Sequence, residues 1–262
     1  MEKTDTAGAA DAWQYITLVT AVIGTLIVML LQDPIAQDIA YHSFADTRTF
    51  FGIPNFFGVT TNIPFLVVGS VGVKYCLNNA STGFWPGWFA LFAGVAMISF
   101  GSGYFHLNPS NDTLVWDRLP MTIGFMGLFV ALLSEYLHLR VGRALLIPAL
   151  LIGVYSVFYW HFFDDLRLYL WVQFMPLLTV IVMVIFFRPT FSKQWMLLAA
   201  LVFYILAKVA EFYDGEIFIL LKGNLSGHSL KHLLSAMGCI VLLLMLINRK
   251  LLDRRNQAAH VV

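Results

Sequence analysis

Residues 168–187 read LYLWVQFMPLLTVIVMVIFF, a run of twenty residues without a charged side chain. A membrane-spanning helix needs about 20 mostly apolar residues, because each residue rises about 1.5 Å through a hydrocarbon core about 30 Å thick. Seven further windows meet this requirement, and aromatic side chains crowd many of their ends, as is typical of membrane interfaces. The eight predicted spans are Ala12–Leu31, Val59–Leu77, Trp85–Phe105, Leu119–Leu137, Ala144–Trp160, Leu168–Phe187, Trp195–Phe212 and Ser229–Ile247.

The composition of the whole chain supports this interpretation. Of 262 residues, 59% are hydrophobic and only 12% are charged, which is about half the charged fraction of a soluble domain. The net charge of +1 argues against a nucleic-acid partner, which usually requires a basic stripe. Cys76 and Cys239 each lie in an apolar run, so neither a disulfide framework nor a cysteine metal site is expected. The sequence therefore predicts an all-α integral membrane protein.

The distribution of Lys and Arg predicts the orientation. The first apolar run follows a polar start and ends without a small-residue cleavage site, so we interpret it as a retained span. Eight spans then place both termini on one side of the membrane. An excess of Lys and Arg on the side of the termini predicts that this side is cytoplasmic. We expect a multi-pass protein of the bacterial inner membrane. The residues of this basic side are Lys3, Lys74, Arg140, Arg143, Arg188, Lys193, Arg249, Lys250, Arg254 and Arg255.

Five polar side chains fall at span ends that share one side of the membrane. Ser102 and His106 end the third span, Asp117 opens the fourth, and His228 and His232 open the eighth. The alternation of up and down spans places all three ends near the extracytoplasmic face. Ionisable groups inside membranes are costly and usually mark functional sites. We therefore expect these residues to form one site.

The spacing of these residues indicates a metal site. Residues four apart share a helix face, so His228 and His232 can face one ion, and Ser102 lies on the face of His106. Three neutral imidazoles with one open position are typical of catalytic zinc. Histidine without cysteine also favours zinc over an iron–sulfur cluster. The sequence thus predicts zinc bound by His106, His228 and His232.

Each of these residues also has an ordinary structural interpretation. Histidines in membranes often serve packing, Asp117 could pair with Arg118, and Ser102 could hydrogen-bond a carbonyl one turn back. His42 and His161 lie on the same side as the site. We interpret both as interfacial, with a fourth ligand or a substrate contact as the alternative.

The remaining ionisable side chains are predicted to have no chemical role. Asp214 and Glu216 could line an entrance, although a solvated loop is the preferred interpretation. The set comprises interfacial histidines far from the site (His138 and His260), loop carboxylates (Asp164, Asp165, Asp214 and Glu216) and a pair on one helix (Lys208 and Glu211).

The order Ser102-x-x-x-His106, Asp117 and His228-x-x-x-His232 resembles the motif set of the alkaline ceramidase family. That family belongs to a superfamily of seven-span hydrolases that includes the progestin and adipoQ receptors. The resemblance covers roughly residues 55–248 and implies a seven-span core. Residues 1–54 then form an additional N-terminal span with its extracytoplasmic loop, and residues 249–262 form a basic cytoplasmic tail. A core that starts outside and ends inside resembles the ceramidases, because the receptors run the other way.

The resemblance implies a reaction and a role for each residue. It makes His106, His228 and His232 zinc ligands, Asp117 the group that transfers protons, and Ser102 a stabiliser of developing charge. The implied reaction hydrolyses the amide of a ceramide-like N-acyl lipid from the membrane to a fatty acid and a long-chain amine. Animal members carry an acidic, tryptophan-containing calcium site before the core. Residues 44–55 here read FADTRTFFGIPN, with one acid and an arginine, so a calcium requirement is doubtful.

Three other functions stay open at this point. A receptor-like or sensory protein would have the same zinc site and little turnover. A haem-binding electron carrier would use paired histidines and absorb visible light strongly. A serine intramembrane protease is suggested by the triplet at residues 101–103, but it would leave the histidine trio unexplained. The sequence specifies neither the exact lipid nor the oligomeric state.

Overall fold

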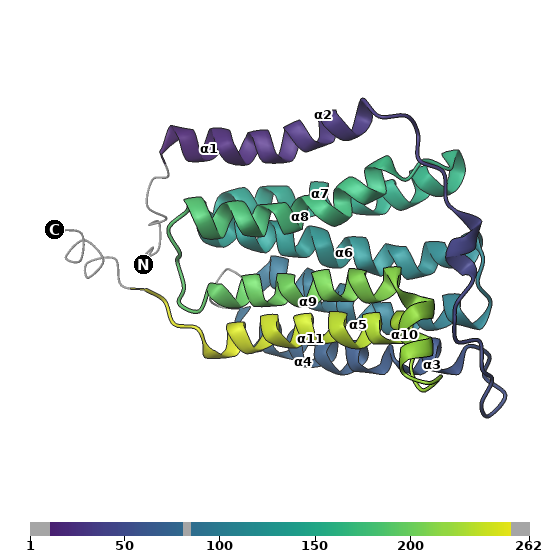
Figure 1. The fold of residues 1–262 in the computed structure, drawn as a ribbon. Helices are drawn as coiled ribbons and strands as arrows, with labels where there is room; N and C mark the ends of the chain where they lie inside the picture. Colours follow the sequence, from purple (N-terminus) through teal and green to yellow (C-terminus); the bar gives the residue numbers. More distant parts are fainter. Residues whose placement is uncertain (1–10, 81–84, 253–262) are drawn as a thin grey trace.

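The computed structural model describes residues 11–80 and 85–252, which form a bundle of long helices (Figure 1). Within these residues, eight helices are long and apolar enough to cross a membrane, so the predicted fold class is confirmed. The first span comprises α1 (Ala12–Val19), the π-helical turn η1 (Thr20–Gly24) and α2 (Thr25–Leu30). The elements that follow are η2 (Ile39–His42), α3 (Phe56–Thr60), α4 (Ile63–Asn78), α5 (Trp85–Leu107), α6 (Asn111–Tyr136), α7 (Leu139–Phe163), α8 (Arg167–Phe186), α9 (Trp195–Phe212), α10 (Asp214–Leu220) and α11 (Gly227–Asn248).

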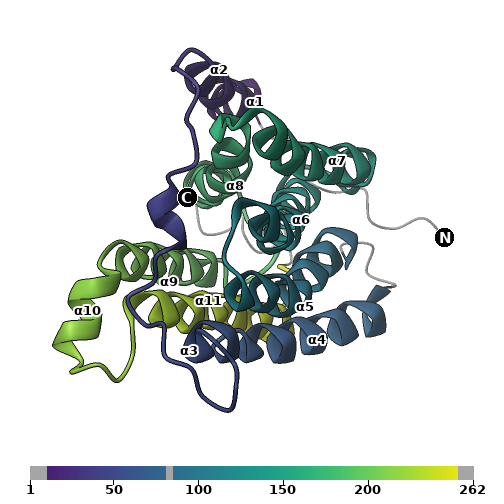
Figure 2. The same ribbon diagram turned by 90° about the vertical axis from the view of Figure 1, so that its right-hand side faces the viewer.

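Helix α6 lies in the middle of the bundle (Figure 2). It packs against α5, α7 and α8, and 72% of its membrane window is buried, compared with 6% for the first span. The first span packs along α8 at the edge of the other seven. Helix α5 ends, and α6 and α11 begin, at the same end of the bundle (Figure 1), which we call the site end.

The start of α6 differs from the sequence prediction. The helix begins at Asn111 rather than at Leu119, because Ser110 caps it and accepts a hydrogen bond from the Thr113 backbone N–H at 3.2 Å. The residues between the two starts are too polar for a hydropathy window to include them. As a result, Asp117 lies inside the second turn of α6 and does not open the helix.

Three glycines spaced by seven residues bring α5 against α6. Gly87, Gly94 and Gly101 all face α6, and their missing side chains allow the two backbones to approach closely. A Cβ atom added at Gly94 would lie 2.6 Å from the backbone nitrogen of Gly124 and 2.7 Å from the Pro120 carbonyl oxygen. Because both of these atoms belong to a helix backbone, α6 would have to move away.

We expect Gly94→Ala to destabilise the protein, and Gly103→Ala on the same helix to be tolerated. A Cβ atom at Gly103 meets no atom within 4 Å, and alanine favours a helix more than glycine does. Overpacking at Gly94 should cost about 1–3 kcal/mol. Thermal unfolding of the two purified variants in detergent makes the comparison, and equal melting temperatures would contradict this packing.

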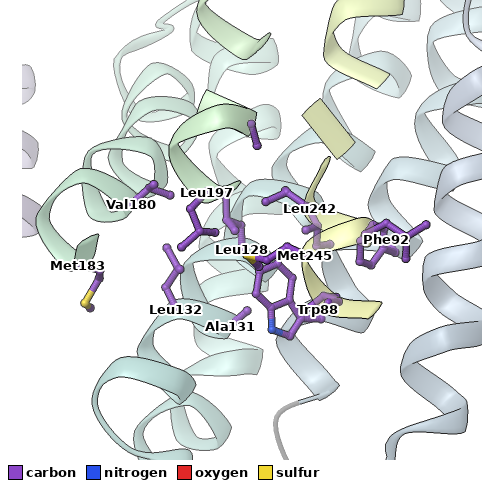
Figure 3. Close-up of a cluster of buried hydrophobic side chains, with 14 of the residues drawn as sticks. Trp88, Phe92, Leu128, Ala131, Leu132, Val180, Met183, Leu197, Leu242 and Met245 are labelled. Carbon is purple, nitrogen blue, oxygen red and sulfur yellow. The ribbon is translucent and has the colours of Figure 1, made fainter. Parts of the chain in front are cut away.

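A cluster of buried apolar side chains closes the bundle at the end opposite the site. Figure 3 shows it, with side chains from α5, α6, α8, α9 and α11 packed together. Trp88, a member of this cluster, donates from Nε1 to Glu135 Oε1 at 2.5 Å. Arg249 pairs with the same carboxylate at 2.7 Å. The labelled members are Trp88, Phe92, Leu128, Ala131, Leu132, Val180, Met183, Leu197, Leu242 and Met245.

Two loop carboxylates hold the long connection between α2 and α3. Asp164 Oδ1 accepts from the Gln37 N–H at 2.9 Å, and Asp165 Oδ1 accepts from the Ile35 N–H at 3.4 Å. Hydrogen bonds from Arg167 keep the pKa of Asp165 below its usual value, although burial opposes this. The prediction that Asp164 and Asp165 only solvate a loop is therefore wrong. The extended connection leaves backbone N–H groups that need acceptors, and these two side chains provide them.

Candidate metal centre

Three buried histidines meet at the site end of the bundle. His106 comes from the last turn of α5, and His228 and His232 come from the first two turns of α11. One ring nitrogen from each lies within 4.8 Å of the other two. The Nε2 atoms of His106 and His228 are 3.2 Å apart. Because zinc binds histidine nitrogen at about 2.0–2.1 Å in tetrahedral sites, two such ligands should lie about 3.3 Å apart. The spacing of His106 and His228 therefore matches two ligands of one zinc ion, and His232 lies close enough to be a third.

Thr61 orients one of these imidazoles. Its hydroxyl lies 2.5 Å from the Phe57 carbonyl oxygen and 2.9 Å from His232 Nδ1. A hydroxyl has one proton to donate, and the carbonyl can only accept it, so the hydroxyl accepts from Nδ1–H of His232. This arrangement leaves the lone pair of His232 on Nε2, the nitrogen that a metal would bind. Sequence reasoning missed Thr61, because only the fold places α3 beside α11.

We expect Thr61→Val to weaken zinc binding by about 10–100-fold, as the loss of an outer-shell partner usually does. Valine has the shape of threonine but cannot accept a hydrogen bond. Thr60→Val is the matched control, because Thr60 also donates to a carbonyl one turn back, at 2.8 Å. Competition with a chelating dye measures the two affinities, and equal values would contradict the assigned role of Thr61.

Two other groups from segments before α5 cover the trio. The ring of Phe44 lies 4.6 Å, centroid to centroid, from those of both His106 and His228. Gly58 packs so closely that a Cβ atom there would lie 2.9 Å from Nδ1 of His106. Together they shield the histidines from water on this side.

The backbone of His228 is held by a carboxylate outside the cluster. Asp214 Oδ1 accepts from the His228 N–H at 2.7 Å, and its Oδ2 accepts from the Ala45 N–H at 2.9 Å. Asp214 and Glu216 lie in helix α10, so their assignment to a loop is wrong. Asp214 therefore fixes the start of α11 relative to the segment that carries Phe44.

A cavity of about 450 Å³ lies beside the trio. His232, Ser102 and Asp117 line it, and all three side chains are buried. Asp117 is not one of the three candidate ligands. The cavity continues between apolar side chains and reaches the cluster of Figure 3 at Leu128 and Leu242. The five predicted site residues are thus brought together, and His232 links the trio to a largely apolar cavity.

Two further polar groups reach this cavity. Asn62 is fully buried, and its Nδ2 donates to the Gly58 carbonyl at 2.7 Å, while its Oδ1 has no hydrogen-bond partner. Burial and the neighbouring Glu211 raise the pKa of Tyr41 well above its usual value, so its hydroxyl stays protonated. Tyr41 donates to Glu211 at 3.3 Å. Neither Asn62 nor Tyr41 was singled out in the sequence.

The predicted pair of Lys208 and Glu211 is present, but it is part of a larger network. Lys208 donates to one oxygen of Glu211, and Lys231 donates to the other at 2.8 Å. All three side chains line the cavity. The pair therefore extends beyond helix α9, because Lys231 of α11 also binds Glu211.

Among the described residues, the other histidines do not join the trio. His42 Nε2 lies 2.9 Å from Asn111 Oδ1, and His161 lies 3.9 Å from Asp112. Neither is a member of the candidate metal group, so the alternative of a fourth ligand gains no support. His138 caps the start of α7 and accepts from the Arg140 N–H at 3.0 Å. His260 lies outside the described residues.

These observations define an all-α, multi-pass membrane protein with a buried three-histidine cluster beside an apolar cavity. Comparisons with known protein families and with curated proteins found no match. The function is therefore argued from the geometry of the site.

Proposed function

We propose that this protein is a zinc-dependent intramembrane hydrolase that cleaves the amide bond of an N-acyl lipid. One observation carries the proposal: three buried imidazoles lie together, and one of them, His232, lines an apolar cavity with the buried side chains of Asp117 and Ser102. The resemblance of the motif to the alkaline ceramidases indicates the same chemistry. The Lys and Arg distribution favours cytoplasmic termini and a site near the extracytoplasmic face of a bacterial inner membrane.

The trio fits zinc better than it fits haem. Three nitrogen ligands around one point suit a tetrahedral site with an open position, whereas haem requires axial ligands on its central iron and room for a flat macrocycle. When bound, zinc supplies the Lewis acid that polarises an amide carbonyl and acidifies the attacking water.

The chain provides the groups that move protons and stabilise charge. Asp117 takes the proton of the attacking water as general base and passes it to the leaving amine as general acid. The Ser102 hydroxyl donates a hydrogen bond to the developing oxyanion, a role worth about 2.7–4 kcal/mol for a well-placed donor. The free Oδ1 of Asn62 accepts from the substrate.

The apolar part of the cavity suits an acyl chain. A second hollow of about 420 Å³ lies between α8 and α9 and is also mostly apolar. The two hollows share Leu177, Leu201, Tyr204 and Lys208 as lining residues. Gln173 of α8 donates to the Tyr204 hydroxyl of α9 at 2.7 Å where they meet. These features favour entry of a lipid from the bilayer between α8 and α9.

The runner-up is a receptor-like or sensory protein with the same metal site and little turnover. Incubation of the purified, zinc-loaded protein with N-acyl lipids, followed by measurement of the released fatty acid, separates the two functions. We expect release that stops on treatment with a metal chelator and resumes when zinc is restored. If no N-acyl lipid is cleaved by protein with a full zinc complement, the hydrolase proposal is wrong and the receptor-like function is preferred.

A further inference from the structure

Arg118 is a buried cation with an unsatisfied hydrogen-bond donor. It follows Asp117 on α6, and only 5% of it is exposed. One terminal guanidinium nitrogen, Nη2, donates to Gln37 Oε1 at 2.6 Å, but the second terminal nitrogen, Nη1, is buried without a hydrogen-bond partner. In the part of the chain that the structure describes, Arg118 forms no ion pair with a carboxylate. An unpaired charge inside a membrane protein is costly and usually marks a ligand or transport site.

The position of the guanidinium is defined by aromatic rings. It lies 4.0 Å from the ring centroid of Trp160 and 4.5 Å from that of Tyr169, within the range of cation–π attraction. Rings on α7 and α8 therefore stabilise the charge, and the Tyr169 hydroxyl also interacts with the Arg118 side chain, yet Nη1 of Arg118 has no hydrogen-bond partner. The Nη1 donor is buried without a partner, in a side chain that lines the cavity.

The carboxylates that line the same cavity are engaged elsewhere. Glu211 binds Lys208 and Lys231, and Asp38 is exposed and accepts from the Ala40 N–H at 2.9 Å. Asp117 is assigned to proton transfer. A zinc ion at the trio would add positive charge to this cavity. Although Asp117 interacts with Arg118 electrostatically, no described carboxylate forms an ion pair with it, so a carboxylate ligand would supply that partner.

We propose that Arg118 binds a carboxylate of the substrate, so that the lipid is a fatty acyl chain amide-linked to a small amino acid. This inference rests on the proposed function and narrows its substrate class. Asp117 and Arg118 are adjacent on one helix and line the same cavity. A carboxylate one carbon away from the amide nitrogen can therefore face Arg118 while the carbonyl faces the trio. Arginine suits this role because its planar fork matches the two carboxylate oxygens.

A neutral lipid would not provide an ion-pair partner for Arg118. The hydroxyl of a ceramide could accept a hydrogen bond from Nη1, but Arg118 would still lack an ion-pair partner in a low-dielectric cavity. A carboxylate could also belong to a free fatty acid, which is the product of the proposed reaction. Substrate and product differ in where the carboxylate lies relative to the acyl chain, so binding can distinguish them.

Binding should be measured in the Asp117→Asn variant, which is expected not to turn over. The probes are N-palmitoylglycine, its carboxamide N-palmitoylglycinamide, a C16 ceramide and palmitate. We expect N-palmitoylglycine to bind at least tenfold more tightly than the carboxamide or the ceramide, and more tightly than palmitate. The inference would be overturned if N-palmitoylglycine and N-palmitoylglycinamide bound equally tightly. It would also be overturned if the ceramide or palmitate bound most tightly of the four probes.

The role of Arg118 can be tested by adding Arg118→Gln to the Asp117→Asn variant, with Arg143→Gln added to Asp117→Asn as the control. Arg143 is exposed on α7 and does not line the cavity. The preference for carboxylate over carboxamide should fall towards one with Arg118→Gln and persist with Arg143→Gln. If the preference for carboxylate persists in the Arg118→Gln variant, another residue binds the carboxylate and the inference about Arg118 is wrong. Should that variant fail to fold, the comparison of the four probes still decides the inference.

The two proposals can fail separately. Carboxylate-selective binding that depends on Arg118, without hydrolysis by the unsubstituted protein, would refute the enzyme and leave the ligand assignment intact. Hydrolysis of ceramide in preference to N-palmitoylglycine would support the enzyme and refute the assignment of Arg118.

Discussion

The double variant His228→Ala/His232→Ala is expected to lose its zinc, whereas the unsubstituted protein should carry about one ion per chain. The reason is geometric: the two imidazoles lie one turn apart on α11, and a ring nitrogen of each lies within 4.8 Å of one on His106 of α5. With two of three ligands removed, a single imidazole cannot hold the ion. Metal analysis of protein purified without added zinc gives the answer directly.

His42→Ala/His161→Ala is the matched control for this measurement. Both residues lie near the site end but outside the trio, so this variant should keep its zinc. Chromatography in detergent should show that both double variants are folded. Zinc that persists without His228 and His232, or a folded protein that never contains zinc, would contradict the proposed metal site and the hydrolase with it.

Replacing Asp117 with asparagine is expected to reduce amide hydrolysis by about 10²–10⁴-fold, the usual contribution of a general acid–base group. Asparagine has nearly the same shape as aspartate, but its amide cannot accept a proton from water near neutral pH. Because Asp117 is not part of the candidate metal group, zinc content should not change. Initial rates of fatty acid release, measured beside metal content, test both statements.

Asp112→Asn is the control for Asp117→Asn. It makes the same chemical change in the first turn of the same helix, where the side chain is 88% exposed, and it should leave the rate nearly unchanged. Normal turnover by Asp117→Asn would remove this residue from the mechanism. A loss of zinc from that variant would instead indicate that Asp117 is a ligand.

Much of the site was predictable because it follows from helix periodicity and from the number of spans. Residues four apart share a face whatever the helix packs against, so His228 and His232 had to point the same way. The alternation of spans then placed Ser102, His106 and Asp117 at the same end. The structure confirms that all five gather at one end of the bundle.

The groups that orient the site could not be predicted, because their partners are far apart in sequence. Thr61 lies 171 residues from His232, and Asp214 lies 169 residues from Ala45. A threonine at the end of a short helix, or an aspartate at the start of one, has many possible partners. Only the packing of α3 and α10 against α11 selects one. The same reason explains why Arg118, which could have paired with Asp117, was not recognised as an unpaired cation.

The sequence by itself determined the fold class, because the free energy of burying apolar residues in a membrane depends on their type and number in a window. It also determined the depth of the candidate ligands and the face of each helix on which they lie. Tertiary structure alone decided the tautomer set by Thr61, the cavity beside His232 and the unpaired state of Arg118. These features depend on distances between helices, and side-chain packing sets those distances only after the spans have come together.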